Sequence, residues 1–144
     1  MAILAIDYGA KKIGLARSDH ERRMALPLGV LINKNQKEIL DHIKLICQRD
    51  EIEKIIVGVP LSLKTTNKEL ILREQDLQNK QMQEVLAFID WLKENIKISI
   101  EMEDERLSTK LANGLRRDLI KGGPDDAVAA MLILQTYLDK NQKS

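Results

Sequence analysis

Acidic residues stand at three points of the sequence where predicted elements begin or end. Asp7 directly follows the opening apolar run, and Asp104 and Glu105 follow a later apolar stretch. Asp125 and Asp126 stand where the last apolar-periodic segment begins. Ligands of α/β sheets bind in the crevice where strand ends converge, so we expect these carboxylates to meet in one crevice.

Carboxylates that meet without cations repel one another, which raises their pKa values. A divalent cation removes that cost, and Mg²⁺ and Mn²⁺ prefer hard oxygen ligands. Two such ions about 4 Å apart can activate a water and stabilise the leaving oxygen of a phosphodiester. Taken singly, each acid is more often a helix cap, a turn residue or a solvated charge. Asp125 and Asp126 in particular suit a helix N-terminus.

The elements predicted around these acids form an α/β sandwich with a mixed sheet. The short links between the first three strands predict an antiparallel meander, because a parallel link needs a longer crossover. Strands are expected at 2–6, 13–17, 25–32, 54–60 and 96–103, and helices over 37–52, around 82–92, within 108–121 and from 124 onward. The polar segment 62–81 is expected to be a flexible loop or the start of an exposed helix.

Length and composition favour one globular domain. The 144 residues contain 44% hydrophobic residues, enough for a core, and the net charge of +1 indicates no strongly basic surface. The single cysteine, Cys47, excludes an internal disulfide, fits a reducing compartment and is expected in the core. No apolar run is long enough to span a membrane and no secretory signal is recognisable, so the expected location is the cytoplasm.

Aromatic and histidine residues add little to the predicted chemistry. Phe88, Trp91 and Tyr137 fall at apolar helix positions, which are more often core positions than base-stacking platforms. His20 and His42 are far apart in the sequence and have no cysteine partners, so no zinc site is expected.

Four segments resemble, in order, the motifs of the YqgF (RuvX) family. They are "AIDYGAKKIGLARSD", "IIVGVPLS", "EDERLST" and "DDAVAAMLILQTYL", and together they cover nearly the whole chain. The family is a compact bacterial branch of the ribonuclease H-like fold, related to the RuvC Holliday-junction resolvases. The resemblance therefore implies one ribonuclease H-like domain over residues 1–144, with a mixed five-stranded sheet flanked by helices.

The activity that the resemblance implies is that of a hydrolase acting on ester bonds, a nuclease with a two-metal-ion mechanism. Family members are linked to 5′-end maturation of pre-16S ribosomal RNA, and were earlier proposed as resolvases. The implied partners are structured or single-stranded RNA, ribosomal precursor particles or branched DNA, with Mg²⁺ or Mn²⁺ and no membrane. A monomer or weak homodimer is expected. The alternatives are a Holliday junction resolvase, a non-catalytic nucleic-acid-binding module and, more weakly, a nucleotide site like that of sugar kinases.

Matching by position assigns the metal ligands implied by the resemblance. Asp7 matches the first acid, Glu105 the second with Asp104 as the alternative, and Asp126 the third, which leaves Asp125 as an extra acid suited to capping. The expected nucleic-acid-binding residues are Gly9, Lys11, Arg106, Arg116, Arg117 and Lys121.

Two segments depart from the family pattern. Ser62, Lys64 and Thr65 stand where relatives carry an asparagine and a glycine-containing turn, and the stretch "LIKGGPDD" is shorter than the basic loop of relatives. Both segments would flank the site, and these departures motivate the alternative of a non-catalytic binding module.

Overall fold

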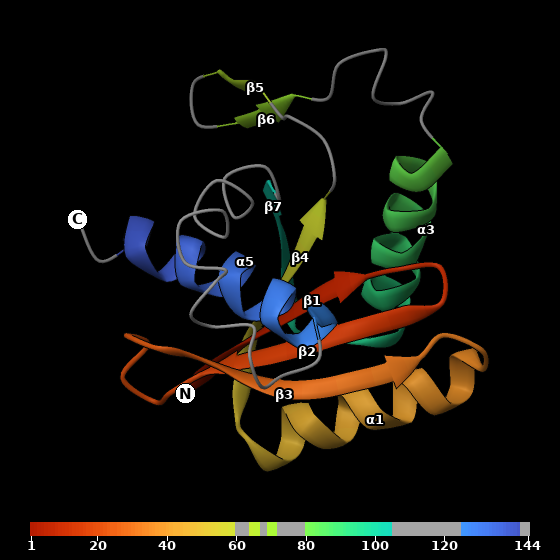
Figure 1. The fold of residues 1–144 in the computed structure, drawn as a ribbon, viewed down its shortest axis with the longest axis horizontal. Helices are drawn as coiled ribbons and strands as arrows, with labels where there is room; N and C mark the ends of the chain where they lie inside the picture. The colour runs from red at the N-terminus through yellow and green to blue at the C-terminus, as the bar shows by residue number, and fades with distance from the viewer. Residues whose placement is uncertain (60–63, 67–68, 72–79, 105–124, 142–144) are drawn as a thin grey trace.

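The computed structural model describes residues 1–59, 64–66, 69–71, 80–104 and 125–141, and these form a mixed α/β fold (Figure 1). For residues 64–66, 69–71, 104, 125 and 126, the structure describes the backbone and not the side chains. The main strands are β1 (Ala2–Tyr8), β2 (Lys12–Ser18), β3 (Ala25–Ile32), β4 (Ile52–Val59) and β7 (Ser99–Asp104). The helices are α1 (Gln36–Arg49), α3 (Lys80–Asn95) and α5 (Asp125–Asn141).

The five main strands form one sheet in the order β3-β2-β1-β4-β7. Strands β1, β2 and β3 pair antiparallel, whereas β4 runs parallel to β1 and β7 runs parallel to β4. The short β1–β2 and β2–β3 links allow only antiparallel neighbours, while the connections through α1 and α3 are long enough for parallel crossovers. The predicted mixed five-stranded sheet with its antiparallel meander is confirmed.

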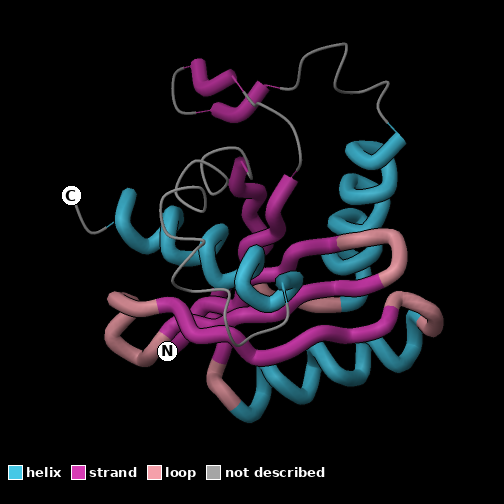
Figure 2. Tube along the Cα trace, in the orientation of Figure 1, coloured by secondary structure: helices cyan, strands magenta, loops and turns pink. Residues whose placement is uncertain are grey.

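Helices cover both faces of the sheet (Figure 2). Buried residues of α1 and α3, among them Ile43, Val85 and Leu92, form one apolar cluster with one face of the strands. Buried residues of α5, among them Ile133 and Leu134, form a second cluster with the other face. Because both faces are buried, the central strands have continuous apolar runs, as the sequences of β1 and β4 show.

The side chains of β1 alternate between these two clusters. Leu4 and Ile6 belong to the α1/α3 cluster, and Ile3 and Ala5 belong to the α5 cluster. Continuing this alternation, Asp7 lies on the α5 face of the sheet. Tyr8 lies on the opposite face, where it packs against the α1/α3 cluster.

The segment after β4 differs from the prediction of a loop or helix start. Within it, β5 (Lys64–Thr66) and β6 (Glu69–Ile71) form a two-stranded antiparallel hairpin, and α3 begins at Lys80. Three-residue strands are too short for an alternating pattern to reveal them. The short helix predicted within 108–121 lies outside the described residues. Among the helices that are described, none has both the length and the apolar character needed to cross a bilayer.

Cys47 lies on the inner face of α1, as predicted. Its side chain is 9% exposed. Burial raises the pKa of the thiol to about 11, and the nearby Asp50 carboxylate adds to this rise. The thiol is therefore protonated at neutral pH, which makes it a core residue without nucleophilic reactivity.

A thiol-specific reagent at about pH 8 should consequently label Cys47 in the folded protein about 100-fold more slowly than in denaturant. Only the thiolate reacts, and an unfolded cysteine has a pKa near 8.5. Absorbance of the released chromophore follows the reaction. Equal rates with and without denaturant would contradict the buried, protonated assignment.

Candidate active site

The carboxyl ends of β1, β4 and β7 lie side by side at one edge of the sheet. Ile6 pairs with Val57, and Gly58 pairs with Glu103. The β1–β4 pairing ends at Ile6 and Val57, so Asp7 and Gly58 are the first residues of their strands beyond it, and Glu103 is the partner of Gly58 on β7. These three strand-end positions form a row in which Gly58 carries no side chain.

Asp7 is half-buried at the end of this row, on the face covered by α5. Its backbone is paired on one side with Gly14 of β2, and the next residue, Tyr8, pairs with Ile13. A carboxylate on a strand that is hydrogen-bonded on both sides and packed on both faces has a well-defined position. That is the requirement for a metal ligand or a catalytic base.

A tight turn follows Asp7 and depends on Gly9. A Cβ atom at Gly9 would lie 2.5 Å from the carbonyl oxygen of Lys12, closer than real Cβ contacts come. The turn is anchored by Asn33, which donates its backbone N–H to the Lys11 carbonyl at 2.9 Å and its side-chain amide to the Gly9 carbonyl at 2.8 Å. Lys11 is exposed on this turn.

The other predicted acids are positioned only in part. Asp104 is the last residue of β7 and pairs with Val59, so its backbone is at the same edge as Asp7. Asp125 and Asp126 are the first two residues of α5. Figure 1 shows that the N-terminal end of α5 points toward the carboxyl end of β1. The N-terminal end of α5 is thus directed toward the end of β1, whereas the end of β7 contacts the last turn of α5 through Glu103 and Lys140.

Several predicted site residues lie outside the described part of the chain. They are Glu105, Arg106, Arg116, Arg117 and Lys121, together with the side chains of Asp104 and Asp126. Within the described residues, no group of three His, Cys, Asp or Glu side chains is placed to hold a metal ion, and Asp7 is the one predicted ligand whose side chain is described.

Two acids of β7 that the sequence analysis did not single out face α5. Glu103 is 5% exposed and accepts a hydrogen bond from the Lys140 ammonium group in the last turn of α5. Glu101 is 3.3 Å from Lys54, whose ammonium group also donates to the Tyr137 hydroxyl at 2.8 Å. These contacts raise the pKa of Lys54, the Tyr137 hydrogen bond most strongly. The signal for these acids was present in "SIEMEDE", where every second residue is Glu.

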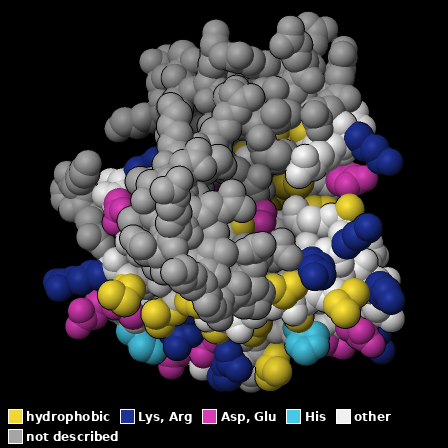
Figure 3. Space-filling model, viewed as in Figure 1, with side chains coloured by type: hydrophobic (Ala, Val, Ile, Leu, Met, Phe, Trp, Pro, Cys, Tyr) yellow, Lys and Arg dark blue, Asp and Glu magenta, His cyan; other side chains and the backbone are white. Residues whose placement is uncertain are grey.

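Surface charge in the described part is mixed. Figure 3 shows Lys and Arg side chains interspersed with Asp and Glu around the described portion of the visible face. This mixture of charges agrees with the net charge of +1. The described surface as a whole therefore has no strong positive field that would attract nucleic acid from a distance.

Comparison with known proteins identifies relatives along the whole chain. A family model described as "RuvX: Holliday junction resolvase" matches residues 1–140. A protein of Rickettsia felis named "Putative pre-16S rRNA nuclease" is 34% identical over 98% of this chain and 88% of its own length. A protein of Rickettsia peacockii with the same name is 35% identical over 95% of this chain and 85% of its own length.

Solved structures share the fold at low sequence identity. The RuvC protein of T. thermophilus, solved in complex with a Holliday junction substrate, superimposes with a TM-score of 0.64 at 16% identity, covering 100% of this chain and 97% of RuvC. A resolvase of Fowlpox virus, solved with Holliday junction DNA, gives a TM-score of 0.53 at 13% identity, with 98% and 99% coverage. The fold is therefore the ribonuclease H-like one that the sequence motifs implied.

Replacing Gly9 with alanine should lower the free energy of unfolding by about 1–3 kcal/mol, because the new Cβ displaces the Lys12 carbonyl and the paired strand ends. Urea denaturation monitored by circular dichroism measures this. Ala10→Ser, at an exposed position of the same turn, is the matched control and should change stability by less than about 0.5 kcal/mol. A Gly9→Ala protein as stable as this control would refute the close-packed turn.

Proposed function

Because the chain belongs to the RuvX family, we propose that it is a metal-dependent endonuclease that hydrolyses phosphodiester bonds during 5′-end maturation of pre-16S ribosomal RNA. The observation that carries the proposal is the position of Asp7. It is held at the carboxyl edge of the sheet, in one row with the buried Glu103 and on the face that α5 covers. The names of the Rickettsia relatives support the ribosomal substrate.

The donor set fits a hard divalent cation, Mg²⁺ or Mn²⁺. Asp7, Glu105 and Asp126 would supply carboxylate oxygens, the ligands these ions prefer. Gly58 leaves the row beside Asp7 without a side chain, which suits a site that must admit both ions and a phosphate. When bound, the ions lower the pKa of a water and stabilise the leaving oxygen. The strand end keeps the Asp7 oxygen in place throughout.

Glu105 is proposed as the second ligand in preference to Asp104. The resemblance to the family matches Glu105 by position to the second acid. Asp104, whose backbone pairs with Val59 at the end of β7, stays the alternative ligand.

Cations around the site would hold the substrate backbone. Lys11 is exposed on the Gly9 turn, five residues from the end of the buried segment of β1. Arg106, Arg116, Arg117 and Lys121 are proposed to contact phosphates as well, by charge-assisted hydrogen bonds. Since the net charge of the chain is only +1, binding would depend on this local group of cations.

Resolution of Holliday junctions is the second candidate function. It is favoured by the description of the family model and by the fold shared with RuvC. Two symmetric cuts in a four-way junction require a two-fold dimer, whereas trimming RNA requires one subunit. Cleavage of a four-way DNA junction by a dimer, without cleavage of the RNA precursor, would replace the RNA assignment with this one.

Asp7→Asn should reduce Mn²⁺- or Mg²⁺-dependent cleavage of a precursor RNA by at least about 10³-fold, because it removes a charged ligand without changing the size of the side chain. Gel analysis of end-labelled RNA measures the rate. Asp41→Asn, at an exposed position of α1, is the matched control and should cleave at the wild-type rate. Equal cleavage by Asp7→Asn and Asp41→Asn, or no cleavage by the wild type with either ion, would overturn the nuclease assignment.

Glu105→Gln and Asp104→Asn distinguish the two neighbouring acids. We expect Glu105→Gln to lose cleavage by at least about 100-fold and Asp104→Asn to retain it within about tenfold. Raising the Mn²⁺ concentration should partly restore a variant that has lost a ligand. The opposite ranking of the two variants would assign the second ligand to Asp104.

A further inference from the structure

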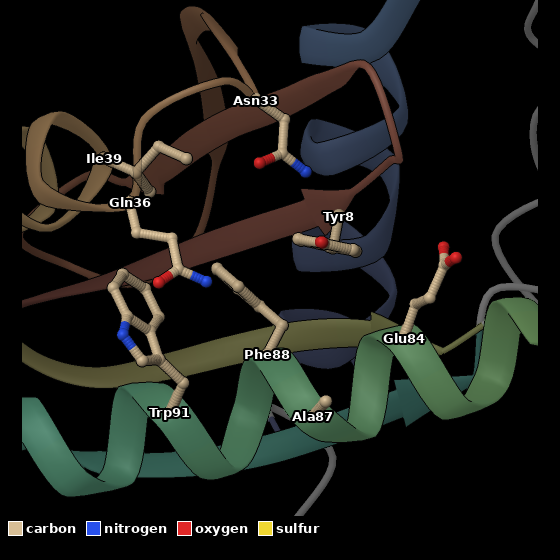
Figure 4. A pocket seen from close by; sticks show the side chains of 8 residues that line it. All are labelled: Tyr8, Asn33, Gln36, Ile39, Glu84, Ala87, Phe88 and Trp91. Carbon is tan, nitrogen blue, oxygen red and sulfur yellow. The ribbon is translucent and has the colours of Figure 1, made fainter.

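A cavity of about 190 Å³ opens between β1, α1 and α3, on the face of the sheet opposite Asp7 (Figure 4). Its lining is contributed by the end of β1, the start of α1 with the turn before it, and the middle of α3. These elements are far apart in the sequence, so the cavity is a product of the fold and not of one motif. Nothing in the proposed metal chemistry uses it.

Three aromatic rings form one side of the cavity. The ring centroids of Tyr8 and Phe88 are 4.4 Å apart at an interplanar angle of 30°, and those of Phe88 and Trp91 are 5.7 Å apart. Phe88 is 7% exposed and belongs to the core, as predicted. Tyr8 and Trp91 are only half-buried, so part of each ring remains accessible to a flat ligand.

Polar side chains that can form hydrogen bonds with the edge of a base line the cavity beside these rings. Figure 4 shows the Gln36 amide extending from α1 toward Trp91 and Phe88, with the Asn33 amide and the Glu84 carboxylate on the other sides of the opening. Amides both donate and accept hydrogen bonds, and a carboxylate accepts from amino groups. Aromatic faces combined with amide and carboxylate edges suit a nucleobase, whereas a purely aliphatic ligand would leave these polar groups unused.

The cavity is connected to the proposed cleavage site through one strand end. Asp7 and Tyr8 are consecutive residues of β1, with Cα atoms about 3.8 Å apart and side chains on opposite faces. Asn33 links the cavity wall to the turn that carries Lys11, through its hydrogen bond to the Gly9 carbonyl. A nucleic-acid strand crossing this edge can thus meet Asp7 with a phosphate and the cavity with a nearby base.

Two exposed lysines adjoin the lining residues in the sequence. Lys34 and Lys37 are exposed and are sequence neighbours of the lining residues Asn33 and Gln36. Their charges can neutralise the phosphates on either side of a bound base. A protein with little net charge needs such local positive charge to bind nucleic acid. Single-stranded nucleic acid is commonly held by this combination of stacking rings and flanking cations.

We propose that this cavity binds one unstacked base of a single-stranded RNA substrate and so sets the position of the strand relative to Asp7. The proposal rests on the proposed nuclease function for the identity of the ligand. Base binding in the cavity would position the RNA strand independently of the metal ligands. Tyr8, Trp91 and Gln36 act here as binding residues and take no part in bond cleavage.

Trp91 is the one tryptophan of the chain, so its fluorescence reports directly on the cavity. The protein is titrated, without divalent ions, with a single-stranded RNA of about ten nucleotides and with an oligomer of equal length made of stable abasic nucleotides. We expect the RNA to quench Trp91 and to bind about tenfold more tightly than the abasic oligomer, because stacking of one base supplies the difference.

Ala87→Phe tests the site directly. Ala87 lines the cavity from an exposed position of α3, so a phenylalanine there should occupy the cavity without disturbing the core. It should abolish both the quenching and the preference for RNA over the abasic oligomer. Lys93→Phe, exposed on the same helix about 120° around it from Ala87, is the control and should keep both. Because the affinities for RNA and for the abasic oligomer are compared within each variant, the loss of the Lys93 charge affects both equally and drops out of their ratio.

Equal binding of RNA and abasic oligomer with unchanged Trp91 emission would overturn the proposal, and so would quenching that persists in Ala87→Phe. Because the titration contains no divalent ion, its outcome does not depend on cleavage. A wild type that cleaves RNA but shows no base-dependent binding would refute the cavity assignment alone, whereas failure of the Asp7→Asn test refutes the nuclease assignment alone.

Discussion

Strand β1 imposes the constraint on which the rest of the structure depends. It is paired on both sides, antiparallel to β2 and parallel to β4, and its first residues are buried on both faces. Its residues therefore have no freedom to change face or register, because a slip by one position would exchange the two apolar clusters. Asp7 and Tyr8 are therefore held in fixed positions at the point where the strand reaches solvent. One strand thus supplies a fixed carboxylate to one side of the sheet and a fixed ring to the other.

The turn after β1 extends this rigidity beyond the sheet. The absence of a side chain at Gly9 lets the chain reverse against the Lys12 carbonyl, and Asn33 then ties the turn to the residues just before α1. Asn35 caps the same helix by accepting from the backbone of Lys37 and Glu38. Short polar side chains therefore hold together the β1–β2 turn and the start of α1. The parts of the cavity lining that β1 and α1 contribute depend on that arrangement.

Two acids on the α5 face, the buried Glu103 and the exposed Glu101, are paired with cations that α5 and β4 supply. Lys140 binds Glu103, and Lys54 binds Glu101 while donating to Tyr137. A buried carboxylate without such a partner would be costly, since its hydration is lost on folding. In the proposed site, the ions would play the same part for Asp7 and its partners. Helix α5 thus completes the core and also balances the charge of β7.

The sequence by itself determined the order and type of the main elements, the antiparallel meander and the inner face of α1 with Cys47, because apolar periodicity and link length are local properties. It also indicated the family through its motifs, and it put Asp7 at the end of the first strand. Only the tertiary structure decided that Asp7, Gly58 and Glu103 share one row, since register depends on pairing between distant segments. It likewise revealed the β5–β6 hairpin and showed that Trp91, expected in the core, borders a cavity with Tyr8 and Gln36. A cavity exists only where separate elements fail to fill the space between them, and no single segment contains that information.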